Sequence, residues 1–198
     1  MWPELCERLD GHLVVLEPVE PEHEESLWEA ARDPKIWTIT TADVGGSRAV
    51  FDAWWTQLRD AFAAGEEVPF ATVLREDGRV VGSTRFLTLR PDHRGVEIGA
   101  TWLRSELWET GANVEAKLLM LDHAFERCGC MRVEFKTDAR NELSRKAMEA
   151  LPARFEGIFR KHMLVRGGDV RDSAYYAITD DDWPAVKANL ERRLEARR

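Results

Sequence analysis

The sequence has few cysteines, no long uncharged apolar run and no grouping typical of a metal site. The three cysteines, Cys6, Cys128 and Cys130, are odd in number and lack zinc-ligand spacing, which favours small thiols that are buried or half-buried. The five histidines are scattered along the chain, and no HExxH pattern occurs. We therefore expect neither a disulfide framework nor a metal.

Signals for a membrane or for secretion are also missing. No stretch reaches the length of an uncharged membrane span, and residues 1–9 have neither the basic start nor the apolar run of a secretory signal. Positive charge is in deficit, because the sequence has 28 Lys and Arg residues and 36 Asp and Glu residues, which gives a net charge of -8. That balance opposes sequence-independent binding to a phosphate backbone. We expect a cytoplasmic protein whose partners are neither nucleic acid nor membrane.

The 198 residues, 44% hydrophobic and 32% charged, suit one domain with a substantial core. Alternating and β-branched runs predict strands over residues 11–19, 68–89 as a hairpin around Asp77-Gly78, 95–103, 131–138, and a final pair over 155–165 and 172–179. Helical spacing and capping residues predict helices over 21–33, 47–65, 113–128, 141–151 and 180–198. This order favours an α/β fold with a single mixed sheet and helices on both faces.

The turn before the predicted helix at 113–128 carries the small pair Gly111 and Ala112. A helix N-terminus exposes unpaired N–H groups and a partial positive charge, so small residues there let a phosphate approach the backbone. Glycine near a helix start also serves conformation alone. The local sequence leaves both interpretations open.

Several stretches together resemble one family. They are the strand GVEIGATWL, the following GAxxEA, and the helix NELSRKAMEAL with FEG after it. They resemble the GNAT superfamily of acetyl-CoA-dependent N-acetyltransferases, and within it they are most similar to the ribosomal-protein N-terminal alanine acetyltransferases. The resemblance implies one GNAT domain over residues 1–198, with a mostly antiparallel sheet that splays between the fourth and fifth predicted strands. It also implies acetyl-CoA as co-substrate and no metal.

In that family a Q/R-x-x-G-x-G/A turn holds the pyrophosphate of coenzyme A through backbone N–H groups. Here only Gly111 matches strictly, since Trp108 replaces Gln or Arg and Asn113 replaces Gly or Ala. Glu109 brings a like charge towards the phosphates. The resemblance thus assigns cofactor binding to Trp108, Glu109, Thr110, Gly111, Ala112 and Asn113.

The pantetheine arm of coenzyme A lies in the splay of this family and hydrogen-bonds to exposed strand backbone. By resemblance, that backbone belongs to Ala100, Thr101, Trp102 and Leu103. For the Trp102 side chain, an ordinary core position is the expectation.

Acetyl transfer needs a neutral amine, donors for the developing oxyanion and a proton for the leaving thiolate. By resemblance, Asn141 binds the pantetheine and Ser144 donates the proton, whereas locally the pair also fits an Asn N-cap with an outward Ser. Glu97, flanked by apolar residues, is the candidate general base, and a solvated strand carboxylate is the alternative. His93 and Glu134 are weaker candidates of the same kind.

The acceptor end should be formed by residues 33–46 and the final hairpin. A protein N-terminal α-amine is the acceptor that the resemblance implies. Two alternatives stay open: a small amine such as a polyamine, amino acid or antibiotic, and a GNAT-like binding module with weak cofactor use. The departures at Trp108, Glu109 and Asn113 motivate the last. A homodimer is also left open.

Overall fold

The computed structural model describes residues 2–38 and 43–197 of the chain. Its strands form one eight-stranded sheet in the order β1-β2-β3-β4-β5-β6-β8-β7. The pairing of β5 with β6 is parallel and the other neighbouring strands pair antiparallel, which confirms the predicted mixed sheet. The strands are β1 (Leu9–Asp10), β2 (Val14–Pro18), β3 (Val68–Leu74), β4 (Val80–Arg90), β5 (Gly95–Leu103), β6 (Arg132–Asp138), β7 (Arg154–Leu164) and β8 (Val170–Thr179).

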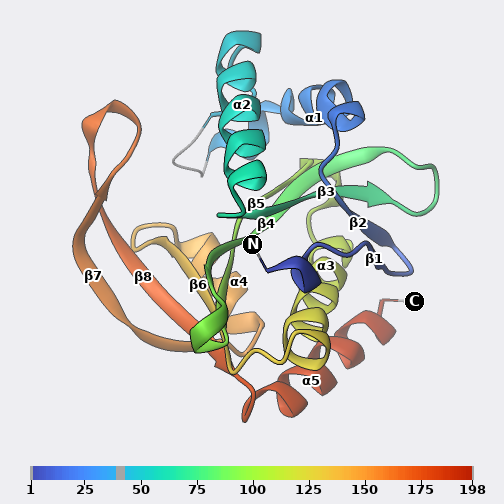
Figure 1. Ribbon diagram of the computed structural model, residues 1–198, viewed down its shortest axis with the longest axis vertical. Coiled ribbons are helices and arrows are strands. Elements are labelled where there is room, and N and C mark those ends of the chain that lie inside the picture. The colour runs from blue at the N-terminus through green and yellow to red at the C-terminus, as the bar shows by residue number, and fades with distance from the viewer. Residues whose placement is uncertain (1, 39–42, 198) are drawn as a thin grey trace.

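Helices cover both faces of the sheet, as predicted (Figure 1). On one face, α1 and α2 bury Leu27 and Phe51 against strand residues such as Val15. On the other face, α3 and α5 lie side by side and bury Met120 and Leu190 in the larger core. The α-helices are α1 (Glu24–Ala31), α2 (Arg48–Ala64), α3 (Ala112–Asp122), α4 (Glu142–Ala150) and α5 (Trp183–Glu195).

Both predicted ends of α2 are confirmed. The Ser47 hydroxyl accepts a hydrogen bond from the Val50 N–H at 3.3 Å, which satisfies one of the donors left open at a helix start. Gly65 ends the helix at a φ of 72°, a conformation that glycine adopts without a Cβ clash.

The predicted strand over 11–19 is wrong at its start. The chain forms β1 and β2 with a turn between them, because the buried Glu115 carboxylate of α3 accepts backbone N–H groups in that turn. The Glu115 Oε1 lies 3.0 Å from the backbone nitrogen of His12. Its Oε2 lies 2.6 Å from the backbone nitrogen of Leu13 and 2.8 Å from that of Val14. A carboxylate from a distant helix therefore sets the local structure here.

Three predicted helices differ in their boundaries, and one of these, predicted over 180–198, is α5 at Trp183–Glu195. The helix predicted over 113–128 is α-helical only to Asp122 and continues as a π-helical turn at His123–Arg127, where His123 Nε2 lies 2.6 Å from the Glu4 carbonyl oxygen. The helix predicted over 21–33 begins as a 3₁₀ turn at Pro21–His23 before α1.

The predicted splay lies between β5 and β6. Their register runs from Gly95 opposite Arg132 to Glu97 opposite Glu134, and no pair follows it within the described ranges. The two strands thus diverge after three residue pairs, on the side where α3 and α4 stand.

The cysteines are free thiols, half-buried at Cys6 and Cys128 and buried at Cys130. In residues 2–38 and 43–197 there is no helix with the length and apolar character needed to span a membrane.

Candidate active site

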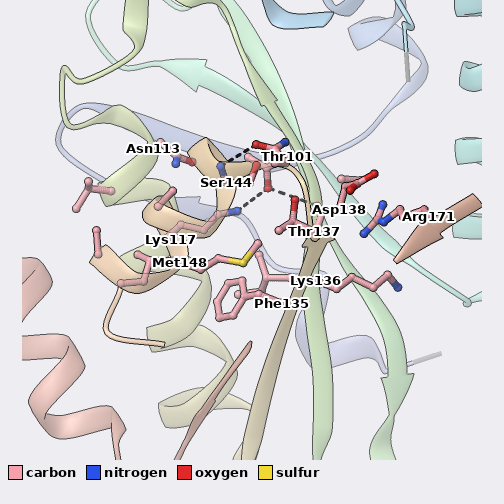
Figure 2. A pocket seen from close by; sticks show the side chains of 18 of the residues that line it. Thr101, Asn113, Lys117, Phe135, Lys136, Thr137, Asp138, Ser144, Met148 and Arg171 are labelled. Carbon is pink, nitrogen blue, oxygen red and sulfur yellow. Dashed lines mark hydrogen bonds between the residues drawn. The ribbon is translucent and has the colours of Figure 1, made fainter. Parts of the chain in front are cut away.

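A cavity of about 330 Å³ lies where β5 and β6 diverge, between these strands and helices α3 and α4 (Figure 2). Five residues assigned by resemblance line it: Ala100, Thr101, Asn113, Asn141 and Ser144. They come from β5, the start of α3 and the more distant start of α4. The fold therefore gathers the central part of the predicted site.

Asn141 and Ser144 stand at the start of α4. The Asn141 side-chain oxygen accepts a hydrogen bond from the Ser144 N–H at 2.9 Å, so the N-cap interpretation is confirmed. Both residues nevertheless line the cavity, and Ser144 is not directed away from it (Figure 2). Capping the helix and facing the cavity are thus compatible, because the cap fixes the first turn against the diverging strands.

On β5, the four predicted backbone residues divide into two pairs. Ala100 has a φ of 48° beside a register shift in the β4–β5 pairing, and it lines the cavity together with Thr101. Trp102 and Leu103 pair with β4 and have buried side chains, so the structure does not bring them to the cavity. The core position expected for Trp102 is confirmed, since its ring lies 5.6 Å from that of Trp37.

In the first turn of α3, Asn113 lines the cavity, whereas Ala112 and the preceding turn residues Trp108, Glu109, Thr110 and Gly111 do not. The Trp108 indole N–H donates to the Leu103 carbonyl at 2.9 Å, which turns this ring towards the strand. Gly111 caps α3 at a φ of 105°, and Glu109 has a φ of 66°. The turn itself does not line the cavity, whereas the helix α3 that follows it does.

Two arginines belong to the same region and were not found from the sequence: Arg193 of α5, and Arg197, which follows the end of that helix. Arg193 lines the cavity, and the Arg197 Cδ lies 3.4 Å from the point where a Cβ on Gly111 would stand. Burial, and next the nearby Arg197 charge, lower the pKa of Arg193. Arg197 at the N-terminus of α3 and Arg193 on the cavity wall add positive charge to a region that suits an anion.

Residues 14–154 of the chain match the acetyltransferase (GNAT) domain family. The chain belongs to the GNAT family. It is 25% identical to the uncharacterized N-acetyltransferase p20 of Bacillus licheniformis over 165 residues, which are 81% of this chain and 90% of that protein.

The solved structure of a GCN5-related N-acetyltransferase from Brucella melitensis is 29% identical, with a TM-score of 0.85 over 94% of this chain and 85% of that one. RimL, a ribosomal L7/L12 alpha-N-protein acetyltransferase solved with coenzyme A, shares the fold at 17% identity, with a TM-score of 0.74 over 89% and 99% of the two chains. The GNAT family makes this chain an acetyl-CoA-dependent N-acetyltransferase.

For this GNAT chain, the candidate base Glu97 lies outside the cavity lining. Its carboxylate is 3% exposed and accepts hydrogen bonds from Lys136 Nζ at 2.8 Å and from Thr88 Oγ1 at 3.1 Å. Lys136 does line the cavity, so Glu97 adjoins it through this partner. Glu134, a weaker candidate, is held instead by Arg90 and Arg132.

The cavity also contains a lysine that the sequence interpretation missed. Lys117 of α3 is 6% exposed, and its Nζ lies 2.6 Å from Thr101 Oγ1 and 3.1 Å from Thr84 Oγ1. The available signal was its position, three residues after Val114 and four before Leu121, on the apolar face of the predicted helix.

Proposed function

We propose that this GNAT protein transfers the acetyl group of acetyl-CoA to the α-amine of a protein N-terminus. The observation that carries the proposal is the cavity at the β5–β6 divergence, with Asn141 and Ser144 on its wall. The RimL likeness concerns the fold and supplies an example of this acceptor class.

Two neighbouring parts of the site would hold coenzyme A, one at its pyrophosphate and the other at its pantetheine arm. The first N–H groups of α3, with Arg193 and Arg197 close by, would bind the pyrophosphate. The backbone at Ala100 and Thr101 and the amide of Asn141 would bind the pantetheine arm. The residues present fit such a ligand, because positive charge gathers at the helix start and an open strand edge follows it.

For the chemistry, we propose that Glu97 takes the proton of the acceptor amine, directly or through water, and that Ser144 acts on the leaving thiolate. The Lys136 ammonium and the Thr88 hydroxyl fix the Glu97 carboxylate. In a pH–rate profile, Glu97→Gln is expected to abolish or move the acidic limb. An unchanged limb would assign the proton transfer to another group.

The acceptor side would be the sheet face opposite α3, where β7 and β8 form a long hairpin (Figure 1). Tyr175 pairs with Lys136 in register, and its ring lies 4.2 Å from that of Phe159. Phe159 is 55% exposed. Residues that follow an N-terminal amine could cover such apolar side chains, whereas a small amine would leave them in water. Of the predicted acceptor segment 33–46, residues 39–42 lie outside the described residues.

An acceptor screen tests the acceptor class. Coenzyme A release would be measured with peptides of varied first residue and, in parallel, with polyamines, free amino acids and aminoglycosides. We expect peptides to give the highest kcat/KM, and Phe159→Ala to raise KM for peptides with little change for any small amine that reacts. Turnover of a small amine alone, unaffected by Phe159→Ala, would replace this proposal with the small-molecule alternative.

A further inference from the structure

Lys117 is a buried amine with no anionic partner. Within residues 2–38 and 43–197, no carboxylate lies within ion-pair distance of its Nζ, which contacts only the hydroxyls of Thr84 and Thr101 and faces the cavity (Figure 2). Burial lowers the pKa of this amine to about 7. The charged and neutral forms are therefore both populated near neutrality.

The surrounding fold gives no reason for a lysine here. Thr84 and Thr101 already hydrogen-bond to each other at 2.8 Å, so neither hydroxyl depends on the amine. An apolar side chain of the same length would suit the core face of α3 at a lower desolvation cost. The amine thus points to a group that enters the cavity.

Ser144 lines the part of the cavity that Lys117 and Thr101 share, and Figure 2 draws it beside this pair. The inference rests on the proposed function, in which Ser144 meets the sulfur end of coenzyme A. We propose that Lys117, as an ammonium, faces that sulfur, stabilises the thiolate as it leaves and returns a proton to it.

The transfer balances in atoms and charge. The C–N bond to the acceptor amine forms while the C–S bond of the thioester breaks, and the electron pair of that bond stays on sulfur. A proton then moves from Lys117 Nζ to sulfur, leaving a neutral amine that is recharged by the proton released from the acceptor, through solvent. The Ser144 hydroxyl has one weakly acidic proton, so it orients the sulfur or relays the proton that comes from Lys117.

Other charged groups on the cavity wall leave Lys117 as the free proton carrier. Lys136 and Asp138 of β6 are engaged by Glu97 and Arg140, and Arg171 of β8 and Arg193 of α5 are always-charged guanidinium groups. Burial is the cause of the shift in the pKa of Lys117.

The test measures the thiol pKa of bound coenzyme A. Thiolate ultraviolet absorbance would be followed against pH in complexes with saturating coenzyme A, and calorimetry would confirm occupancy of each variant. In the unaltered protein we expect the bound thiol pKa to lie about one to two units below that of free coenzyme A, because the thiolate and the Lys117 ammonium each favour the charged form of the other. Lys117→Met should return it to the free value or higher. Lys187→Met on α5, which removes a lysine paired with Asp122 outside the cavity, should behave as the unaltered protein does.

Lys117→Gln provides a second neutral variant should the Met variant fold poorly. An equal bound-thiol pKa in the unaltered protein and in either neutral variant would overturn the assignment of Lys117 while leaving coenzyme A binding, and so the proposed function, intact. Absence of coenzyme A binding to the unaltered protein would instead overturn both.

Discussion

At the residue scale, a substitution at Ser144 can distinguish an effect on the acetyl-transfer step from an effect on cofactor binding. Its backbone N–H belongs to the α4 cap while its side chain shares the cavity wall with Asn141, so removal of the hydroxyl leaves the cap in place. Ser144→Ala is expected to lower kcat by about 10²-fold, in the range of general-acid effects, with little change in coenzyme A affinity.

Asn141→Ala is the matched contrast, because it removes both the cap and a cavity contact. It should weaken coenzyme A binding and lower stability by about 1 kcal/mol. Single-turnover experiments would measure the rate of acetyl transfer in the two variants, and calorimetry would measure their coenzyme A affinity and thermal stability. A Ser144→Ala protein with unchanged kcat would assign that hydroxyl to a structural role.

Lys117 also makes stability depend on pH. Its pKa falls from 10.5 to about 7 on folding, so between these values the unfolded chain binds one proton more than the folded one. The free energy of unfolding of the unaltered protein therefore gains up to ~1.4 kcal/mol per pH unit from this group as pH rises through that window.

Lys117→Met has no such pH dependence, so its stability advantage over the unaltered protein should be largest at and below pH 7 and shrink towards pH 10.5. Denaturant unfolding at several pH values between 7 and 10.5 would measure the difference in the free energy of unfolding between the two proteins. A constant difference between the two proteins would show that the amine keeps its charge when buried.

At the element scale, the turn that leads into α3 has a strained backbone conformation at Glu109. Glu109 has a φ of 66°, in the left-handed region that favours glycine. Glu109→Gly should raise the thermal midpoint, since a non-glycine residue at positive φ costs about 1–2 kcal/mol, partly offset by unfolded-chain entropy. It should also tighten coenzyme A binding by removal of a like charge.

Glu109→Ala is the control, because it removes the charge and keeps the strain. Both variants should bind coenzyme A more tightly, and the Gly variant alone should melt higher. Unchanged affinity in both would show that Glu109 points away from the phosphates.

The Glu115 contact ties α3 to the β1–β2 turn. Three backbone N–H groups share one buried carboxylate, so Glu115→Gln should cost about 2 kcal/mol or more and lower the thermal midpoint by several degrees. Calorimetric melting measures this, with the exposed Glu195→Gln as control. Equal melting of both variants would contradict the structural role of the Glu115 contact.

Elements whose signals are local could be predicted. Ser47, Gly65 and Asn141 act within a few residues of their own positions. The helix α2 begins and ends, and α4 begins, where these residues indicate. The β1–β2 turn could not be predicted, because it depends on Glu115 about a hundred residues away. The same holds for the site: Asn141 and Ser144 were found, whereas Lys117 and Arg193 depend on tertiary placement.

At the scale of the whole molecule, the sheet brings the two halves of the chain to one cavity. We infer a single GNAT domain, because β5 and β6 join in one sheet while α3, α4 and α5 all contribute to the cavity wall. The cytoplasmic location and a homodimer stay predictions. The proposed function requires that coenzyme A enter the β5–β6 divergence.

Calorimetric titration with acetyl-CoA tests that requirement most directly when it is combined with a variant that fills the cavity. Ala147 of α4 is exposed and lines the cavity, whereas its neighbour Lys146 is exposed and does not line it. We predict 1:1 binding to the unaltered protein with a Kd on the order of micromolar, in the usual range for enzyme substrates. Ala147→Phe should weaken binding at least about tenfold, and Lys146→Phe should leave it unchanged. No binding to the unaltered protein, or equal binding to the Ala147→Phe variant, would contradict the account.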